Sequence, residues 1–299
     1  ENDDVNGEQP IFERRSDASI NASRQVEIKK FISKGFVKDW NLEDAKATGA
    51  RILTGTWVDP AHKEKSRYCA REFNTHKDPT VFAAASDDIS TLVIDMIAVK
   101  KGYPQLDFDA VSAFTQAEEE ELIFIWPPEE YQTTVDGTVV WQCVRKLYGR
   151  RNAARSWQEH FTKCIVADDN GWKFAQDLKF PSLYYSKELD TTVDVHVDDG
   201  HSTGPEASLT KMMTFLASKL DLEFSPLQWS GSERIHLGIR RLRTPEGMIL
   251  APDMKYIESS LREYDMIFCN SSPSPKLDKQ QLDDDATELN VEEASKYRT

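Results

Sequence analysis

The protein has 299 residues and a formal net charge of -14, with 29% charged and 39% hydrophobic residues. This length is sufficient for one large or two medium domains with a sizeable core. Its cysteines (Cys69, Cys143, Cys164 and Cys269) form no closely spaced pair, which argues against a small disulfide-stapled fold and favours reduced thiols inside a cell. No apolar run approaches roughly 18 residues, so we expect no membrane association.

The acidic net charge alone argues against nucleic-acid binding, which usually needs a basic surface. Basic residues nevertheless cluster in two strips that could follow a phosphate chain. The first strip comprises Arg145, Lys146, Arg150, Arg151 and Arg155, and the second comprises Arg234, Arg240, Arg241 and Arg243. The acidic run 118–121 is expected to form a solvated face.

In chain order, residues 1–28 are polar and predict a loose leader, and 25–47 predict a helix. Two β-like runs, 51–58 and 67–73, predict a hairpin. Residues 86–101 predict a further helix, with an N-cap at its first residue and Gly102 at its end. Its apolar face is expected to hold Ile89, Leu92, Val93 and Met96.

The second half of the chain continues the alternation of helices and hairpin-built strands. The expected elements are a strand at 103–108, helices at 153–167, 208–220 and 254–264, and hairpins at 191–201 and 235–251. From residue 270 the chain is rich in serine and proline and then acidic, which is typical of a linker. Helices packed on hairpin-built strands predict an α+β fold.

The segment 192–200 carries the clearest chemical pattern. Val193, Val195 and Val197 alternate with Asp194, His196 and Asp198, so a strand would have one apolar and one acidic face. Asp199 and Gly200 form a strong turn signal. Two adjacent carboxylates at a hairpin tip suit a divalent metal, although an ordinary solvated turn is the alternative.

A second strand, 105–110, places Asp107 and Asp109 on one face. Nucleotidyl transfer uses two metal ions about 4 Å apart, which requires a third carboxylate beside an Asp-Asp pair. Taken alone, the segment also fits an ordinary strand with one wet face. If it serves catalysis, Asp109 should converge with Asp198 and Asp199.

These segments together resemble the reverse transcriptases of copia-type LTR retrotransposons. The sequence DAVSAF at 109–114 resembles the motif DVxxAF of that family, and HVDD at 196–199 stands where it has YVDD. The other matching segments are KSRYCAREF at 65–73 (family KARLVAKGF), LYGRRNAARSW at 147–157 (LYGLKQAPRxW), IHLGI at 235–239 (FLGIEI), KYIESSL at 255–261 (YIxxLL) and SKYR at 295–298, near the start of the thumb.

The resemblance implies an RNA-directed DNA polymerase of a Pol polyprotein that uses Mg²⁺ or Mn²⁺, an RNA template, a DNA primer and dNTPs. Asp109, Asp198 and Asp199 would be the catalytic and metal-binding residues. The nucleotide-binding residues would be Arg67, Phe114 (the sugar gate), Tyr148 and Gly149, and the primer grip would include Leu237 and Gly238. An intracellular location follows, in a cytoplasmic particle or the nucleus.

The implied fold is a right-hand polymerase with fingers and palm and with the thumb largely missing. The expected parts are a leader and helix at 1–50, fingers at 51–105 and 117–160, palm at 106–116 and 161–250, a helix leading toward the thumb at 251–275 and an acidic linker at 276–299.

Departures from the family motifs predict weak polymerisation. His196 replaces a tyrosine, the return strand 200–204 lacks apolar residues and should hold the carboxylates loosely, and the acidic run 118–121 should repel a phosphate backbone. The chain also ends where the thumb is expected to begin. Two other hypotheses stay open: a catalytically eroded nucleic-acid-binding relic, and an acidic protein-interaction domain.

Overall fold

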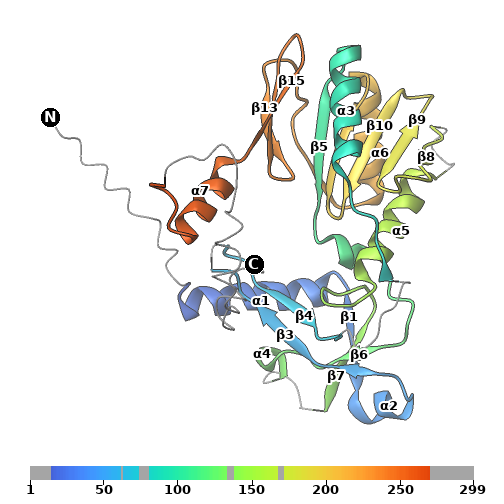
Figure 1. Ribbon diagram of the computed structural model, residues 1–299. Coiled ribbons are helices and arrows are strands. Elements are labelled where there is room, and N and C mark those ends of the chain that lie inside the picture. The colour runs from blue at the N-terminus through green and yellow to red at the C-terminus, as the bar shows by residue number, and fades with distance from the viewer. Residues whose placement is uncertain (1–14, 62, 74–80, 133–137, 168–171, 270–299) are drawn as a thin grey trace, which may run out of the picture. The chain divides into compact units, whose positions relative to one another are not determined.

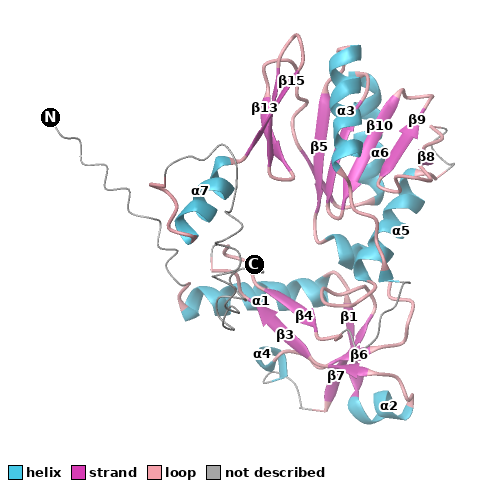
Figure 2. Ribbon diagram, in the orientation of Figure 1, coloured by secondary structure: helices cyan, strands magenta, loops and turns pink. Residues whose placement is uncertain are grey.

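The computed structural model describes residues 15–61, 63–73, 81–132, 138–167 and 172–269. The chain divides into two units, one formed by 1–234 with 241–249 and the other by 235–240 with 250–299. The expected acidic linker at 276–299 and the start of the leader lie outside the described residues. Helices and largely antiparallel sheets confirm the α+β class (Figure 2).

The segment expected to be a single helix at 25–47 contains three elements. Helix α1 (Asp17–Ser33) begins inside the predicted loose leader, strand β1 (Val37–Asn41) follows, and α2 (Leu42–Ala47) ends the segment. The prediction was wrong because Gly35 adopts a left-handed conformation (φ 66°), which ends α1 and redirects the chain into a strand.

The N-terminal half of the first unit is built on a four-stranded sheet of order β1-β7-β6-β2. Its other strands are β2 (Ile52–Leu53), β6 (Phe124–Ile125) and β7 (Val139–Cys143), with the short helix α4 (Glu129–Gln132) between the last two. The predicted hairpin is confirmed in β3 (Gly55–Val58) and β4 (Arg67–Ala70). Buried Phe31, Trp141 and Leu147 form the centre of this core.

Helix α3 (Asp88–Lys101) is confirmed and ends at Gly102, but its cap and its buried face differ from the prediction. Asp87 is the N-cap and accepts a hydrogen bond from the Ser90 amide at 2.8 Å. The expected apolar face is largely exposed, since Ile89, Leu92 and Met96 lie on the surface and the helix instead buries the residues Ser90, Thr91, Ile94, Asp95 and Ala98.

A six-stranded sheet of order β12-β5-β11-β10-β9-β8 forms the rest of the first unit. Its strands are β5 (Gln105–Ala110), β8 (Ala175–Gln176), β9 (Leu183–Ser186), β10 (Thr191–His196), β11 (Asp199–Thr203) and β12 (Leu222–Phe224). A 3₁₀ helix, η2 (Ala113–Gln116), follows β5.

Helices cover both faces of this sheet (Figure 1). Helices α5 (Ala153–Ile165) and α6 (Glu206–Lys219), both predicted, bury aromatic and aliphatic side chains against the apolar face of β5 and β10. Helix α3 contacts β10 and β11. The side chains between α3 and the sheet are mostly polar.

The last elements are a three-stranded sheet of order β13-β14-β15 and helix α7. The strands are β13 (Glu233–His236), β14 (Ile239–Arg243) and β15 (Met248–Pro252), and α7 covers Met254–Glu263. The predicted strand at 235–243 is interrupted because Leu237 and Gly238 both have positive φ and form a turn. No helix in the described ranges is both long and apolar enough to cross a bilayer.

Candidate active site

The three carboxylates expected to be catalytic lie at one end of β5 and β11. Asp109 in β5 is the direct antiparallel partner of Asp199, the first residue of β11. Asp198 lies in the turn before Asp199, and its carbonyl accepts a hydrogen bond from the Ala110 amide at 2.9 Å. All three aspartates are exposed, and the register confirms that Asp109 and Asp199 share one face of the sheet.

The turn that carries Asp198 is two residues earlier than predicted. Val197 and Asp198 form a two-residue hairpin loop, whereas Asp199 and Gly200 already belong to β11. Val197 has φ 57°, a conformation that two-residue hairpins require and that a β-branched residue adopts only with strain. The indole Nε1 of Trp157 donates to the Val197 carbonyl at 2.5 Å and holds this conformation.

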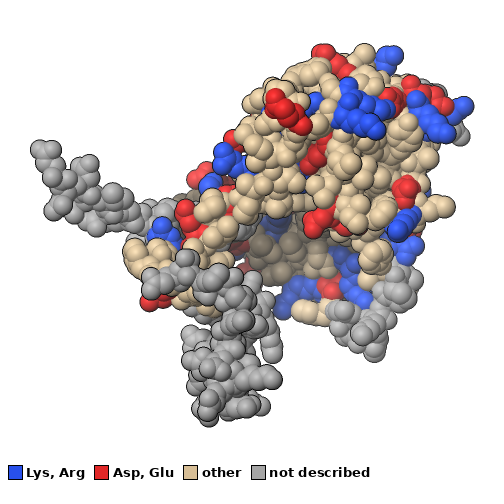
Figure 3. Space-filling model, turned by 45° about the horizontal axis from the view of Figure 1, so that its top comes forward, with Lys and Arg blue, Asp and Glu red and all other residues tan. Residues whose placement is uncertain are grey.

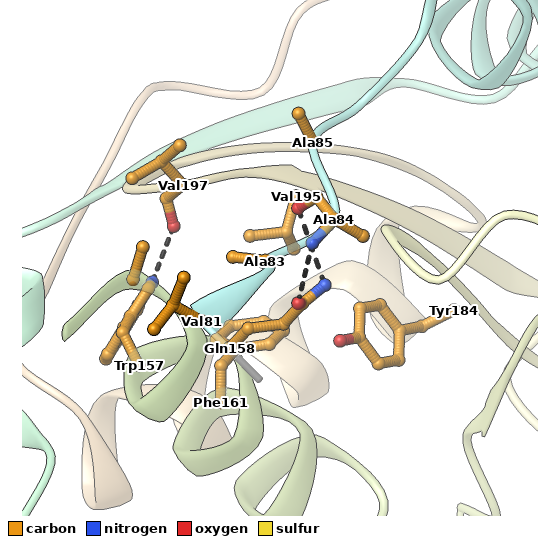
Figure 4. A pocket seen from close by; sticks show the side chains of 11 residues that line it. Val81, Ala83, Ala84, Ala85, Trp157, Gln158, Phe161, Tyr184, Val195 and Val197 are labelled. Atoms are coloured by element: carbon orange, nitrogen blue, oxygen red, sulfur yellow. Dashed lines mark hydrogen bonds between the residues drawn. The ribbon is translucent and has the colours of Figure 1, made fainter. Parts of the chain in front are cut away.

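A mostly apolar cavity of about 240 Å³ lies beside this turn (Figure 4). Val195 and Val197 of the hairpin line it together with Trp157, Phe161 and Tyr184. Val195 of the hairpin also packs in one hydrophobic cluster with Trp157, Phe161 and Tyr184, which adds to the indole hydrogen bond at Val197.

The carboxylates repel one another. Partial desolvation by the surrounding protein, followed by the charges of Asp198 and Glu223, raises the pKa of Asp109. Partial desolvation, followed by the charges of Asp198 and Asp109, raises the pKa of Asp199. Glu223 contributes to this repulsion because β12 pairs with β5 and places Glu223 opposite Asp109. No sequence motif indicated this fourth carboxylate.

The donor set fits a divalent cation. Carboxylate oxygens are the hard ligands that Mg²⁺ and Mn²⁺ prefer, and a cation would relieve the repulsion that raises these pKa values. Within the described ranges, no three His, Cys, Asp or Glu side chains converge closely enough to form a preformed metal cage.

The return strand β11 is firmly packed, contrary to the expectation of a loose hairpin. It lies between β5 and β10 and is buried from Gly200 to Thr203. Ser202 and Thr203 donate hydrogen bonds to the Leu106 and Pro104 carbonyls at 2.8 and 2.9 Å. A Cβ on Gly200 would lie 2.0 Å from the Phe108 ring, so this glycine allows the ring to pack across the strand.

A buried ionic network lies between α3 and the sheet. His201, which is 0% exposed, has its Nδ1 2.7 Å from Asp107 and its Nε2 2.8 Å from the guanidinium of Arg234. Arg234 also pairs with Asp107 and Asp95, and Arg241 pairs with Asp95 at 3.1 Å. Burial alone would raise the pKa of Asp95, but the hydrogen bond and charge of His201 and the charge of Arg241 lower it to about 2.

The predicted nucleotide-binding residues form one contact group. The Arg67 guanidinium lies 5.2 Å from the centre of the Tyr148 ring, and the Phe114 ring centroid lies 5.2 Å from the same ring. Gly149 has φ 82°, and a Cβ there would lie 2.0 Å from the Ala70 carbonyl oxygen. The glycine of this motif is therefore required by the close approach of two backbone segments.

Several members of the two basic strips are neutralised inside the protein. Within the first strip, Lys146 is 2.6 Å from Glu119, and Arg150 pairs with Glu119, Glu121 and Glu72. The Glu119 side chain is 0% exposed, so the acidic run is in part a buried counter-charge and the expectation of a solvated face was wrong there.

Most of the second strip is buried, although Arg240 is exposed. The Arg234 side chain is 7% exposed, and the residues Arg241 and Arg243 are 5% and 6% exposed. Arg243 also donates hydrogen bonds to the Ala98 and Tyr103 carbonyls. Acidic and basic side chains are interspersed on the face shown in Figure 3. The expectation that the first strip could follow a phosphate chain was therefore wrong at Arg150, whose side chain is 1% exposed.

The predicted primer-grip residues, Leu237 and Gly238, belong to the second unit. They form the β13–β14 turn with φ 49° and 72°, and the Gly238 carbonyl accepts a hydrogen bond from the Asp253 amide at 3.1 Å. This turn is well defined within its own unit, and its primer-grip role stays a prediction.

Comparison with known proteins adds a family match to this geometry. The model of the family described as reverse transcriptase (RNA-dependent DNA polymerase) matches residues 40–278. No curated protein matches the chain. Two solved structures that are similar are the foamy viral protease-reverse transcriptase in complex with dsDNA and its dRH form in complex with dsDNA.

The structural similarity is distant. The dRH form aligns with a TM-score of 0.42 at 12% identity over 87% of this chain and 38% of that chain. The other aligns with a TM-score of 0.43 at 12% identity over 85% of this chain and 44% of that chain. The protein thus spans less than half the length of either solved chain. Because the family match covers well over half of its residues, the chain belongs to the reverse transcriptase (RNA-dependent DNA polymerase) family.

Proposed function

We propose that this protein is the RNA-directed DNA polymerase domain of a copia-type LTR retrotransposon and that it acts by two-metal nucleotidyl transfer. The observation that carries the proposal is the register that sets Asp109 opposite Asp199, with Asp198 in the adjoining turn. The family match and the copia-type motifs support the same reading. Fingers and palm would follow the boundaries given above, and an intracellular location is part of the proposal.

The proposed reaction is attack of a primer 3′-hydroxyl on the α-phosphate of a dNTP, with release of pyrophosphate. Asp109, Asp198 and Asp199 would hold two Mg²⁺ or Mn²⁺ ions, which supply activation of the hydroxyl and stabilisation of charge on the phosphates. Arg67 would bind phosphate oxygens, because its guanidinium is a planar fork that matches them. Phe114, packed on Tyr148, would exclude a 2′-hydroxyl from the sugar position.

Two structural reasons for expecting weak activity do not hold. The return strand is buried and hydrogen-bonded. The acidic run has cationic partners, since Glu119 and Glu121 pair with Arg150. We therefore propose that the carboxylates are held well enough for measurable, metal-dependent extension.

Primer extension tests this function. The purified protein is given poly(rA)–oligo(dT), dTTP and Mg²⁺ or Mn²⁺. Asp198→Asn should reduce extension by at least about 100-fold, because several kcal/mol of charge stabilisation are lost. Asp88→Asn, an exposed change in the first turn of α3, is the matched control and should retain activity. Equal incorporation by wild type and Asp198→Asn would contradict the proposal.

A second candidate is a nucleic-acid-binding relic without polymerase activity. The internal pairing of Lys146, Arg150 and Arg234 argues against it, because it removes from the surface the cations that a phosphate backbone needs. Salt-dependent primer–template binding without incorporation would identify the relic. No binding at low salt would instead support an acidic protein-interaction domain.

A further inference from the structure

Helix α1 contacts the turn that follows the strand carrying Asp109. The Lys30 ammonium donates a hydrogen bond to the Ser112 hydroxyl at 2.6 Å. Ser112 is buried and has φ 55°, so it lies at the sharp bend between β5 and η2. The helix ends at Ser33, before the residues that match the family model, and no motif pointed to it.

Lys30 is part of a compact group of cations. The Tyr148 hydroxyl also interacts with Ser112, and the Arg67 guanidinium lies over the Tyr148 ring at 5.2 Å. The charge of Lys65 acts on both Lys30 and Asp109. Lys30 and Lys65 therefore add two cations to the residues proposed to bind the nucleotide, which already include Arg67.

The acidic partner of this group is Glu27. Its side chain is 5% exposed and lies 3.5 Å from Lys30, one turn along α1. Within the described ranges its Oε1 atom has no hydrogen-bond partner. Burial raises the pKa of Glu27, with an opposing effect from Lys30. Burial also lowers the pKa of Lys30, so this ammonium is only partly compensated.

We propose that Lys30 is a substrate-positioning residue that binds the polyphosphate of the incoming nucleotide together with Lys65 and Arg67. Its ammonium lies at the bend only three residues after Asp109, where a nucleotide aligned with the carboxylates would place its phosphates. A partly buried cation with one carboxylate partner is stabilised by a polyanion, and Glu27 keeps Lys30 charged and oriented until that ligand binds. This inference rests on the proposed polymerase function.

Nucleotide binding is the decisive test, because it does not need turnover. Affinity for dTTP and for thymidine is measured by calorimetry with Ca²⁺ on the full chain. Lys30→Gln should weaken dTTP binding about tenfold and leave thymidine binding unchanged, because only the former carries phosphates. Lys29→Gln, an exposed change on the same helix, should alter neither, and Lys30→Arg should restore most of the dTTP affinity.

Two further measurements separate positioning from folding. Thermal melting checks that each variant is folded, and the double variant Glu27→Gln/Lys30→Gln removes the pair without leaving a lone buried carboxylate. The double variant should lose dTTP affinity to the same extent as Lys30→Gln. In primer extension, Lys30→Gln should raise KM for dTTP about tenfold with a smaller change in kcat.

The outcomes distinguish this inference from the proposed function. Unchanged dTTP affinity in folded Lys30→Gln, with wild type active in extension, overturns the role of Lys30 alone. Wild type that binds dTTP and loses affinity in Lys30→Gln, but does not extend a primer, supports the phosphate site and contradicts the polymerase function. Wild type that neither binds dTTP nor extends a primer overturns both.

Discussion

Replacing Arg234 by methionine tests the buried ionic network directly. The guanidinium is 7% exposed and pairs with Asp107 and Asp95 while contacting His201. Removing one partner of a buried ion pair generally destabilises by about 3–5 kcal/mol, because a charge is left unpaired. Arg241 still pairs with Asp95, so we expect the lower end, about 3 kcal/mol, and a melting temperature lowered by roughly 6–12 °C.

Urea unfolding of matched variants measures this effect. Arg155→Met removes a half-exposed pair with Glu159 four residues along α5 and should change stability by less than about 0.5 kcal/mol. The double variant Asp107→Asn/Arg234→Met should be less destabilised than the sum of the single variants, because both charges are removed. Arg234→Met within about 1 kcal/mol of wild type would refute the reasoning, since the pair would then not be buried as described.

Three other outcomes follow from the structure. The folded pKa of Asp95 is about 2, below its ordinary 3.8. Its ionised form therefore contributes roughly 2 kcal/mol to the free energy of unfolding at neutral pH, and this contribution is lost as pH falls from about 4 toward 2. Acid unfolding that is unaffected by Asp95→Asn would contradict this. Gly200→Ala should destabilise by about 1–3 kcal/mol through its clash with Phe108, whereas Gly247→Ala, which meets no atom within 4 Å, should not. Because the pKa of Asp109 is raised, this carboxylate takes up a proton at a higher pH than an ordinary aspartate, and Mn²⁺ affinity should begin to fall at that higher pH. Calorimetric titration at pH 7.5 and 5.5 would show this fall, and equal affinities would argue against it.

Local patterns predicted the strands that carry the carboxylates. Alternation of Val193 and Val195 with Asp194 and His196 indicated the two faces of β10. The two-metal requirement, with the aspartates on the polar faces of two strands, predicted that Asp109 would meet Asp199. Such patterns report which side chains share a face, and this information is local to a strand. The predicted position of the turn was wrong because an Asp-Gly pair is a stronger sequence signal for a turn than Val197. The φ of Val197 is held by a hydrogen bond from Trp157, which lies in helix α5.

Burial of charge could not be predicted in the same way. Lys146 and Arg150 have the composition of a phosphate-binding strip, yet their partner Glu119 lies about thirty residues earlier and pairs with them only in the fold. The same holds for Lys30, whose contact with Ser112 spans 82 residues. Charged residues are rarely buried, so a sequence argument places them on the surface unless long-range partners are known.

The small and polar residues of β11 also affect how reliably this strand finds its correct register during folding. Glycine, serine and threonine give this strand almost no alternation of apolar and polar side chains. The pairing register of such strands shifts easily relative to their neighbours. In this protein a slip by one residue would turn His201 toward the aromatic core around Phe108 and away from Asp107 and Arg234, so that the imidazole would lose its polar partners. The free-energy cost of burying an imidazole without a hydrogen-bond partner therefore disfavours misaligned hairpins, and the correct register places Asp109 and Asp199 at the same edge of the sheet.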